Sequence, residues 1–332
     1  MGAYICTVFM QVHYNIEQLP AFRNAVITIG TFDGVHMGHR QIIDKLKSEA
    51  KAINGETVII TFHPHPRKVI SSTILGVRLI NTLNEKIGLL EQLGIDHLVV
   101  VPFTDAFANQ PAEEYVKNFL IHRFHPHTII IGYDHRFGKE RKGDYLLLEK
   151  MAGEFNFILK EIPKHVLEEI SISSTRIREA LLAGKIEIAD KLLGYDFFFS
   201  GTVIHGNKLG RKLGYPTANL KIEDEEKITP GNGIYAVYVE VEEPKSEVRG
   251  QRLDPGLQTP LLKGMMSIGF RPTVDGKQRV IEVNIFDFDN EIYEQQLKVY
   301  VKKYLREEEK FDSLEELVKQ IDQDKIESLK VL

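Results

Sequence analysis

The sequence predicts a two-domain protein: an α/β domain on a doubly wound parallel sheet, then a small antiparallel β-barrel or sandwich that ends in a helix. Short, continuous apolar runs alternate with amphipathic segments in the first half, which is typical of a parallel sheet covered by helices on both faces. After Leu193-Gly194 the runs instead alternate apolar and polar residues between turn signals, which favours antiparallel strands. A chain of 332 residues can bury two cores, and we expect domains over 1–185 and 186–332.

The expected elements of the first domain follow its apolar runs. Strands are expected over 25–29, 57–62, 97–101, 128–131 and 156–162, and helices over 38–52, 83–93, 112–122, 144–151 and 175–182. Thr82 and Glu85 form a capping box before the second of these helices. Ligands of such sheets bind where the strands end, so the loops 30–34, 63–66 and 132–138 should converge on one edge.

The second domain is expected to contain strands over 233–241, 264–268, 280–286 and 297–301. Turn residues such as Asp275-Gly276 and Asp289-Asn290 separate them. A final helix should begin at Asp312 or Ser313 and carry Leu314, Leu317, Val318 and Ile321 on one face.

Composition narrows the function classes. The formal net charge of −5, with 27% charged residues, argues against a broad nucleic-acid surface. No apolar run approaches the roughly 20 residues that span a bilayer, and no secretory signal is recognisable. The single cysteine excludes an internal disulfide and fits a reducing compartment, so we expect a cytoplasmic protein with small-molecule partners. Oligomeric state cannot be read from this sequence.

The turn Gly30-Thr31-Phe32-Asp33-Gly34 and the string His36-Met37-Gly38-His39 follow the first expected strand directly. The order of strand, glycine-rich turn and helix places both histidines at a helix N-terminus, where backbone N–H groups and the helix dipole attract anions. This pattern predicts a triphosphate site. Two alternatives remain at this point: a zinc clamp completed by His63 and His65, or two histidines with no role.

A second string, Ile172-Ser173-Ser174-Thr175-Arg176-Ile177-Arg178, supports the phosphate interpretation. Ser173 or Ser174 would cap a helix over 175–182, whose first turn would then carry Arg176 and Arg178. Cations there oppose the helix dipole by roughly 0.3–1 kcal/mol each. A bound anion would remove this conflict.

Together these strings resemble the paired signature of the nucleotidylyltransferase superfamily, and more narrowly the FAD synthetase domain of bacterial bifunctional riboflavin kinase/FAD synthetases. Further matching segments are 62–66, 103–108 and 132–138. The resemblance implies a Rossmann-like fold that joins FMN and ATP to give FAD and pyrophosphate. It implies that His36 and His39 are catalytic, and that the following residues bind ATP phosphates: Gly30, Phe32, Asp33, Gly34, His36, Gly38, His39, Asp134, Ser173, Ser174, Thr175, Arg176 and Arg178. His63 departs from the family pattern, in which a carboxylate is common.

In the second half, glycines spaced four apart, at Gly206, Gly210 and Gly214, precede Pro216-Thr217-Ala218-Asn219. Glycines in a β-rich domain often mark only turns and bulges. Lys208, Arg211 and Lys212 among them are what a phosphate cradle would add. The hydroxyl and amide oxygens of Thr217 and Asn219 suit a hard cation such as Mg²⁺.

The Pro-Thr-Ala-Asn segment resembles the riboflavin kinase signature, in which the Thr and Asn handle Mg²⁺ and phosphate. Glu282 matches the family's catalytic base; Ile281, Val283 and Ile285 share the opposite strand face. Without the resemblance, Glu282 would read as an ordinary surface glutamate. Arg306, Glu308 and Phe311 match residues near the flavin, whereas Ser267, Asn284 and Glu294 depart from the common pattern.

The expected function is therefore bifunctional: ATP and Mg²⁺ would convert riboflavin to FMN in the C-terminal barrel and FMN to FAD in the N-terminal domain. Two rivals remain. One is a different nucleotidylyltransferase, such as one that uses CTP, fused to the kinase; the other is a flavin-binding regulator without catalysis.

Overall fold

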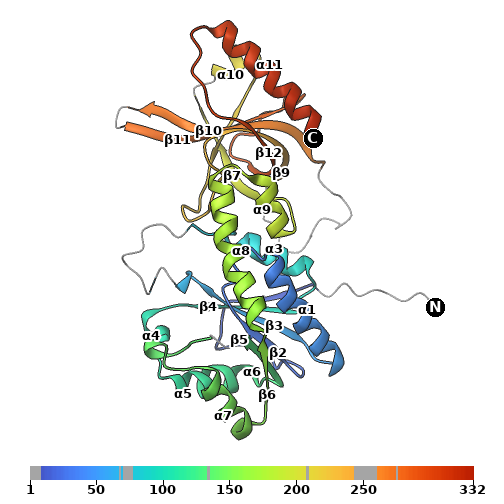
Figure 1. Cartoon of the computed structure of the whole chain (residues 1–332), viewed down its shortest axis with the longest axis vertical. Helices are drawn as coiled ribbons and strands as arrows, with labels where there is room; N and C mark the ends of the chain where they lie inside the picture. Colours follow the sequence, from blue (N-terminus) through green and yellow to red (C-terminus); the bar gives the residue numbers. More distant parts are fainter. Residues whose placement is uncertain are drawn as a thin grey trace, which may run out of the picture. The chain divides into compact units, whose positions relative to one another are not determined.

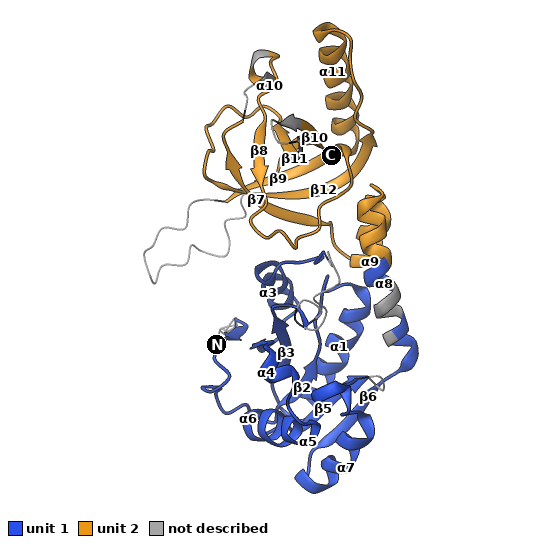
Figure 2. Cartoon of the chain, turned by 90° about the vertical axis from the view of Figure 1, so that its left-hand side faces the viewer, with its two compact units in different colours: residues 1–175 blue, residues 176–332 orange. Residues whose placement is uncertain are grey.

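The computed structural model describes residues 9–66, 69, 78–132, 135–206, 209–242, 260–273 and 276–332. The chain forms two compact units, residues 1–175 and 176–332 (Figure 2). The division falls within one helix, α8 (Lys164–Leu182). The domain boundary expected after residue 185, beyond the end of this helix, stays a prediction.

A six-stranded parallel sheet organises the first unit (Figure 1). Its strands are β1 (Gln11–His13), β2 (Val26–Ile29), β3 (Thr57–His63), β4 (His97–Pro102), β5 (Thr128–Gly132) and β6 (Ile158–Ile162). They lie in the order β1-β4-β3-β2-β5-β6. β3 and β4 therefore follow one another on one side of β2, and β5 and β6 follow one another on its other side. The five expected strands are confirmed, and β1 is an additional edge strand. The reversal of strand order between β2 and β5 is where doubly wound sheets bind ligands.

The helices of this unit are α1 (Met37–Ala52), α3 (Leu83–Gln92), α4 (Asp105–Ala108), α5 (Ala112–Glu114), α6 (His122–Phe124), α7 (Tyr145–Phe155) and α8, with a short 3₁₀ turn η2 (Lys139–Arg141). The capping box at Thr82 is confirmed, because its hydroxyl accepts from the Glu85 N–H and the Glu85 carboxylate accepts from the Thr82 N–H. The single helix expected over 112–122 is instead a composite, in which a π-helical segment η1 (Tyr115–Ile121) joins α5 to α6. Buried aromatic rings of η1, Tyr115 and Phe119, pack in the core below the strand ends.

The helix expected to begin at Thr175 begins eleven residues earlier, so that expectation was wrong. Ser173 and Ser174 lie inside α8 and do not cap it, and Arg176 and Arg178 lie in its interior. The argument that these arginines oppose a helix dipole at an N-terminus therefore does not hold. The physical reason is Pro163, which directly precedes α8 and suits a helix start, so the helix continues through the serines.

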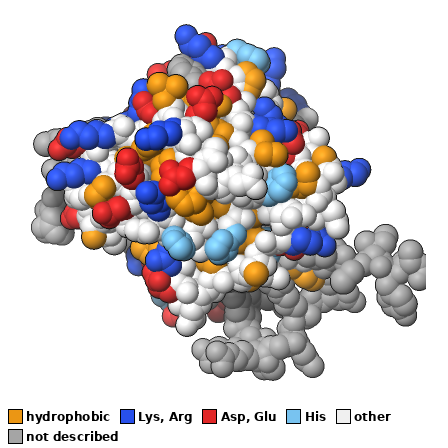
Figure 3. All heavy atoms as spheres, turned by 90° about the horizontal axis from the view of Figure 1, so that it is seen from below, with side chains coloured by type: hydrophobic (Ala, Val, Ile, Leu, Met, Phe, Trp, Pro, Cys, Tyr) orange, Lys and Arg blue, Asp and Glu red, His pale blue; other side chains and the backbone are white. Residues whose placement is uncertain are grey.

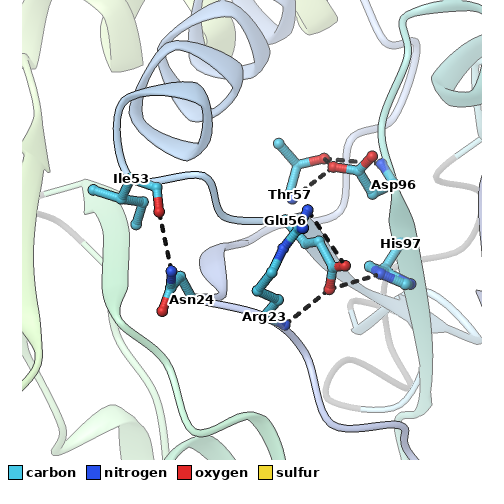
Figure 4. A network of polar contacts seen from close by, with 7 residues as sticks. All are labelled: Arg23, Asn24, Ile53, Glu56, Thr57, Asp96 and His97. Atoms are coloured by element: carbon cyan, nitrogen blue, oxygen red, sulfur yellow. Dashed lines mark hydrogen bonds and ion pairs between the residues drawn. The ribbon is translucent and has the colours of Figure 1, made fainter.

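The amino edge of the sheet is held by polar side chains between strand starts (Figure 4). Asp96 Oδ2 accepts from the Thr57 N–H at 2.8 Å and from its hydroxyl at 2.7 Å. Glu56 accepts from the Arg23 N–H at 2.9 Å and lies 3.4 Å from His97 Nε2. These contacts satisfy backbone groups where β3 and β4 begin, leaving the carboxyl edge of the sheet for the candidate site.

The second unit contains a closed antiparallel barrel in the order β10-β11-β8-β7-β12-β9. Its elements are α9 (Ile186–Leu193), β7 (Phe198–Ile204), α10 (Leu209–Lys212), β8 (Ala218–Lys221), β9 (Gly233–Glu242), β10 (Leu262–Thr273), β11 (Gly276–Ile285), β12 (Gln296–Arg306) and α11 (Leu314–Val331). The four expected strands are confirmed in longer form, and β7 and β8 complete the barrel. Inward-facing Ile281, Val283 and Ile285 of β11 are buried, as the alternation predicts.

The terminal helix α11 begins as expected, because the Ser313 hydroxyl accepts from the Glu316 N–H. Its most buried residues are nevertheless polar, Asp324 and Ser328, while Leu314 is 61% exposed. Leu314 stands in the first turn of α11, and the buried residues of this helix lie further along the chain.

Within the described residues, no helix combines the length and the apolar character needed to cross a membrane. The face seen from below the view of Figure 1 carries acidic, basic and hydrophobic side chains interspersed (Figure 3).

Candidate active sites

The first candidate site is built on the connection between β2 and α1. Gly34 adopts a φ of +89°, and the non-glycine residues Phe32 and Val35 also take left-handed φ values of 46° and 38°. Such conformations are strained for Phe and for a β-branched residue, and they persist because both side chains are buried at 2% or less exposure. The turn is thereby held rigidly at the carboxyl end of β2.

His36 and His39 stand at the start of α1, as the sequence predicts. His36 is the N-cap, no side chain caps the helix, and its first turn contains no acidic residue. The two imidazole rings stack at 4.0 Å between centroids. Both are buried, and the pKa of His39 lies well below its ordinary value, chiefly because of burial and then because of the neighbouring His36 and Lys86. His39 Nδ1 has no hydrogen-bond partner among the described residues, so a polar atom inside the site is left for a ligand.

The two signature strings meet in space. His36 Nε2 lies 2.9 Å from the hydroxyl oxygen of Ser174 on α8. Ser173 beside it is buried, whereas Thr175 is exposed. Arg176 and Arg178 belong to the second unit. The predicted juxtaposition of the histidines with the serine segment is therefore observed, although it does not depend on a helix N-terminus.

Asp33 is buried and holds the segment that precedes α3. Its Oδ1 accepts from the Ile80 N–H at 2.9 Å and from the Asn81 N–H at 3.2 Å. The carboxylate thus ties the turn to the start of α3. Asp33 also lines a small pocket at this edge of the sheet, together with Phe62, His63, His65, Leu79, Asn81, Leu83 and Lys86.

Lys86 was missed at the level of sequence. It lies on the buried face of α3 with Leu89 and Leu90, three and four residues on. A lysine on an apolar helix face is the signal that could have found it.

The zinc alternative is not supported by the described part of the chain, where no group of three or more His, Cys, Asp or Glu side chains is placed to hold a metal ion. Of the expected site residues, Asp134 and Lys208 lie outside the described residues, as does the side chain of Lys212.

The second candidate site lies on the barrel, where the glycine-rich segment approaches β8. A Cβ atom added to Gly206 would overlap the Asn219 amide, and one added to Gly210 would overlap the Tyr215 carbonyl and lie 3.3 Å from Thr217 Oγ1. Gly214 takes a φ of +83°. Gly206 and Gly210 are therefore needed for close approach to Asn219 and to the Tyr215–Thr217 segment, whereas Gly214 is needed for its left-handed turn.

The strand register places the predicted catalytic residues in one row. Asn219 of β8 pairs with Glu282 of β11, and Glu282 pairs with Ser267 of β10. Directly opposed residues of antiparallel strands project from the same face, so Asn219, Glu282 and Ser267 share the outer face of the barrel. Arg271 Nη2 lies 2.7 Å from Glu282 Oε2, and the Glu282 side chain is 25% exposed.

Asn284, two residues beyond Glu282, is buried on this same face. Its Nδ2 donates to the Pro216 carbonyl at 2.7 Å. This bond anchors the backbone immediately before Thr217, so the departure from the family pattern at Asn284 has a defined structural partner.

The three expected flavin residues have distinct surroundings. Arg306 makes a two-pronged ion pair with the buried Asp324 of α11, at 2.8 and 2.7 Å, and lies 5.8 Å from the Phe311 ring centroid. The Glu308 carboxylate lies against Gly269 of β10, where a Cβ atom would overlap it. Arg306 is therefore engaged by the terminal helix, while Glu308 lies over the same sheet face as Ser267.

Comparison with known proteins identifies relatives over both units. Residues 19–176 match the family model described as FAD synthetase, and residues 193–332 match the one described as riboflavin kinase. The bifunctional riboflavin kinase/FMN adenylyltransferase of Buchnera aphidicola subsp. Schizaphis graminum is 38% identical over 94% of this chain and 94% of that protein. The proteins of the same name from Escherichia coli (strain K12) and Bacillus subtilis (strain 168) are 34% and 35% identical over 94% and 96% of this chain, and over 94% and 95% of their own lengths.

A solved structure, described as a macrolide-efflux protein from Streptococcus pneumoniae, is 30% identical and aligns with a TM-score of 0.78 over 96% of this chain and 98% of that chain. The match shows a shared fold. Together with the order of the two family matches and the identity of the full-length relatives, it confirms the resemblance inferred from the motifs. The chain belongs to the family of bifunctional riboflavin kinase/FMN adenylyltransferases.

Proposed function

We propose that this chain makes FAD from riboflavin in two ATP-dependent steps, each in its own domain. The C-terminal domain, 186–332, phosphorylates riboflavin to FMN, and the N-terminal domain, 1–185, adenylylates FMN to FAD with release of pyrophosphate. Its membership of the bifunctional family, with one family match in each half, carries this proposal. Two candidate sites with different chemistry, one based on the turn between β2 and α1 and one on the barrel, support it.

In the adenylyltransferase, an FMN phosphate oxygen attacks the α-phosphorus of ATP, and the bond from that phosphorus to the bridging β-phosphate oxygen breaks. The protein's task is alignment and charge stabilisation. His36 and His39 donate to the triphosphate from the start of α1. Ser173, Ser174, Thr175, Arg176 and Arg178 hold the leaving pyrophosphate, and the contact between His36 and Ser174 supports this assignment. Gly30, Gly34 and Gly38 leave room for the phosphates, with Phe32, Asp33 and Asp134 completing the site.

In the kinase, Glu282 accepts the proton of the riboflavin 5′-hydroxyl while its oxygen attacks the γ-phosphorus, and ADP leaves. A carboxylate serves this role when it is within hydrogen-bond reach of the hydroxyl. The Arg271 side chain that pairs with Glu282 is 55% exposed. The glycines and Arg211 of the preceding segment cradle the ATP phosphates, with Lys208 and Lys212.

Mg²⁺ would be held by Thr217 and Asn219. The donor set fits, because hydroxyl and amide oxygens are hard oxygen ligands. Gly206 and Gly210 crowd onto these two side chains where any Cβ would intrude, as a cradle for a phosphate-bound cation requires. When bound, Mg²⁺ would neutralise charge on the transferred phosphoryl group.

Arg306, Glu308 and Phe311 remain the proposed flavin contacts of the kinase. Glu308 has the strongest support, since it lies against β10 beside the row that contains Glu282. The cytoplasmic location and the restriction to small-molecule partners stay predictions from composition.

Incubating the full chain with riboflavin and Mg-ATP, followed by chromatography, tests the assignment. FMN should appear first and FAD should follow. FAD formation that prefers CTP over ATP would overturn the adenylyltransferase assignment. Bound but unchanged riboflavin would indicate a regulator without catalysis.

A further inference from the structure

Lys86 is a buried cation at the edge of the first candidate site. The residue is only 7% exposed. Its Nζ donates to the Thr31 carbonyl at 2.6 Å and lies 3.5 Å from Thr61 Oγ1. Thr31 is part of the glycine-rich turn, so the Lys86 ammonium group is hydrogen-bonded to the backbone of that turn.

The charge of Lys86 is incompletely compensated. Among the described residues, no carboxylate lies within salt-bridge distance of the Lys86 Nζ. Asp33 is the carboxylate that lines the same pocket, and its Oδ1 accepts hydrogen bonds from the Ile80 and Asn81 N–H groups. Burial lowers the pKa of Lys86 to about 8, although the Asp33 charge opposes this change. A cation buried at such a cost is expected to serve a negatively charged ligand.

The neighbouring His39 supplies less of that charge. Burial, His36 and Lys86 together keep the pKa of His39 well below its ordinary value, so His39 is neutral near pH 7 and donates at most one N–H. Lys86, whose Nζ contacts the turn at the Thr31 carbonyl, therefore adds a positive charge there that His39 does not supply. The titratable groups that share its pocket are Asp33, His63 and His65, with His39 close by on α1.

We propose that Lys86 is a positioning residue of the adenylyltransferase, which fixes the Thr31 carbonyl beneath the phosphate-binding turn and adds a buried positive charge to the field that the ATP triphosphate enters. The inference rests on the proposed FAD synthesis. It requires Lys86 to be protonated, so apparent affinity for ATP should weaken as the pH rises through about 8. This loss at high pH, the alkaline limb of the pH profile, should be absent when FMN formation by the same chain is measured.

Lys86→Met and Lys86→Arg in the full chain test this proposal. The matched control is Lys47→Met. It also removes a hydrogen bond from a lysine to a backbone carbonyl, since Lys47 Nζ donates to the Leu93 carbonyl at 2.7 Å, but Lys47 lies on an exposed part of α1. Lys86→Met should lower kcat/KM for ATP in FAD synthesis by at least about tenfold, mainly through KM, and abolish the alkaline limb. Lys86→Arg should retain more activity and move the limb beyond pH 9, because guanidinium stays charged. Lys47→Met should leave FAD synthesis within about twofold, and all three variants should make FMN normally.

An unchanged KM for ATP and an unchanged pH profile in Lys86→Met would overturn the proposal. If that variant fails to fold, the wild-type chain still decides, because equal alkaline limbs for FAD and FMN formation, or none for FAD, would contradict it. A wild-type chain that makes no FAD from FMN and ATP would instead refute the proposed function itself.

Discussion

His36 Nε2 lies 2.9 Å from the Ser174 hydroxyl, although 138 positions separate the two residues in the chain. One begins helix α1 and the other lies within α8, so the contact joins the two sequence strings that suggested a nucleotide site. A buried histidine beside a hydroxyl, at the start of a helix that no side chain caps, places hydrogen-bonding groups where phosphate oxygens can bind.

Replacing either histidine should stop the second reaction alone. His36→Ala or His39→Ala is expected to reduce FAD formation from FMN and ATP by about 10²–10³-fold, because a donor to the transition state is lost. Ser174→Ala, which removes one hydrogen bond, should cost about tenfold. Rates of FMN formation from riboflavin, measured on the same preparations, serve as the control. Loss of both activities in a folded variant would contradict the division of labour between the domains.

Replacing Glu282 should stop the first reaction alone. Glu282→Gln keeps the shape of the side chain but cannot take up the proton, so FMN formation should fall by about 10²–10⁴-fold. FAD formation from supplied FMN should be unchanged. Arg271→Ala removes only a partly exposed ion pair, so the kinase rate should change less than about fivefold. A Glu282→Gln variant with normal kinase activity would exclude Glu282 as the base.

Asn284 should act through the backbone that it holds. Asn284→Ala removes the donor to the Pro216 carbonyl and should raise the kinase KM for Mg-ATP about five- to tenfold, with a smaller effect on kcat. Asn284→His restores an N–H donor and should recover part of this loss, whereas Asn284→Asp should not. Steady-state kinetics of the three variants distinguish these outcomes. Equal behaviour of His and Asp would show that the hydrogen bond is unimportant.

Arg306 should contribute more to stability than the exposed ion pairs of α11. Arg306→Met leaves the buried Asp324 carboxylate without its cation, with the Gln320 amide still donating to it, so the free energy of unfolding should fall by about 3–5 kcal/mol. The double variant Arg306→Met/Asp324→Leu should recover most of the lost free energy of unfolding. Lys330→Met, which breaks an exposed pair with Glu327, should change it by less than about 1 kcal/mol. Denaturant unfolding measures the free energy of unfolding of all three variants. Weaker riboflavin binding by the double variant would support the proposed contact between Arg306 and the flavin.

Local patterns predicted most of the fold. The apolar runs located β2 to β6, and the capping box at Thr82 marked the start of α3, because burial and capping are encoded within a few residues. The turn, both histidines, Thr217 and Glu282 could likewise be read from short strings.

What escaped prediction depends on tertiary contacts. β1 has three residues and becomes a strand only by pairing with β4. Ser173 and Ser174 carry the side chains of a helix cap, but α8 begins at Lys164 and passes through them. Lys86 and Asp324 interrupt the apolar pattern of their helices, and only the folded chain reveals the Thr31 carbonyl and the Arg306 guanidinium that they meet.

The pairing of Asn219 with Glu282 has a consequence for how this kinase can vary. β8 is hydrogen-bonded to β11 on one side and β7 on the other, and a closed barrel offers no free border along which it could slide. A slip of one residue would turn Asn219 inward and away from the carboxylate. Insertions and deletions are thus confined to the connecting loops, and changes in substrate choice must come from exchanging side chains at fixed positions.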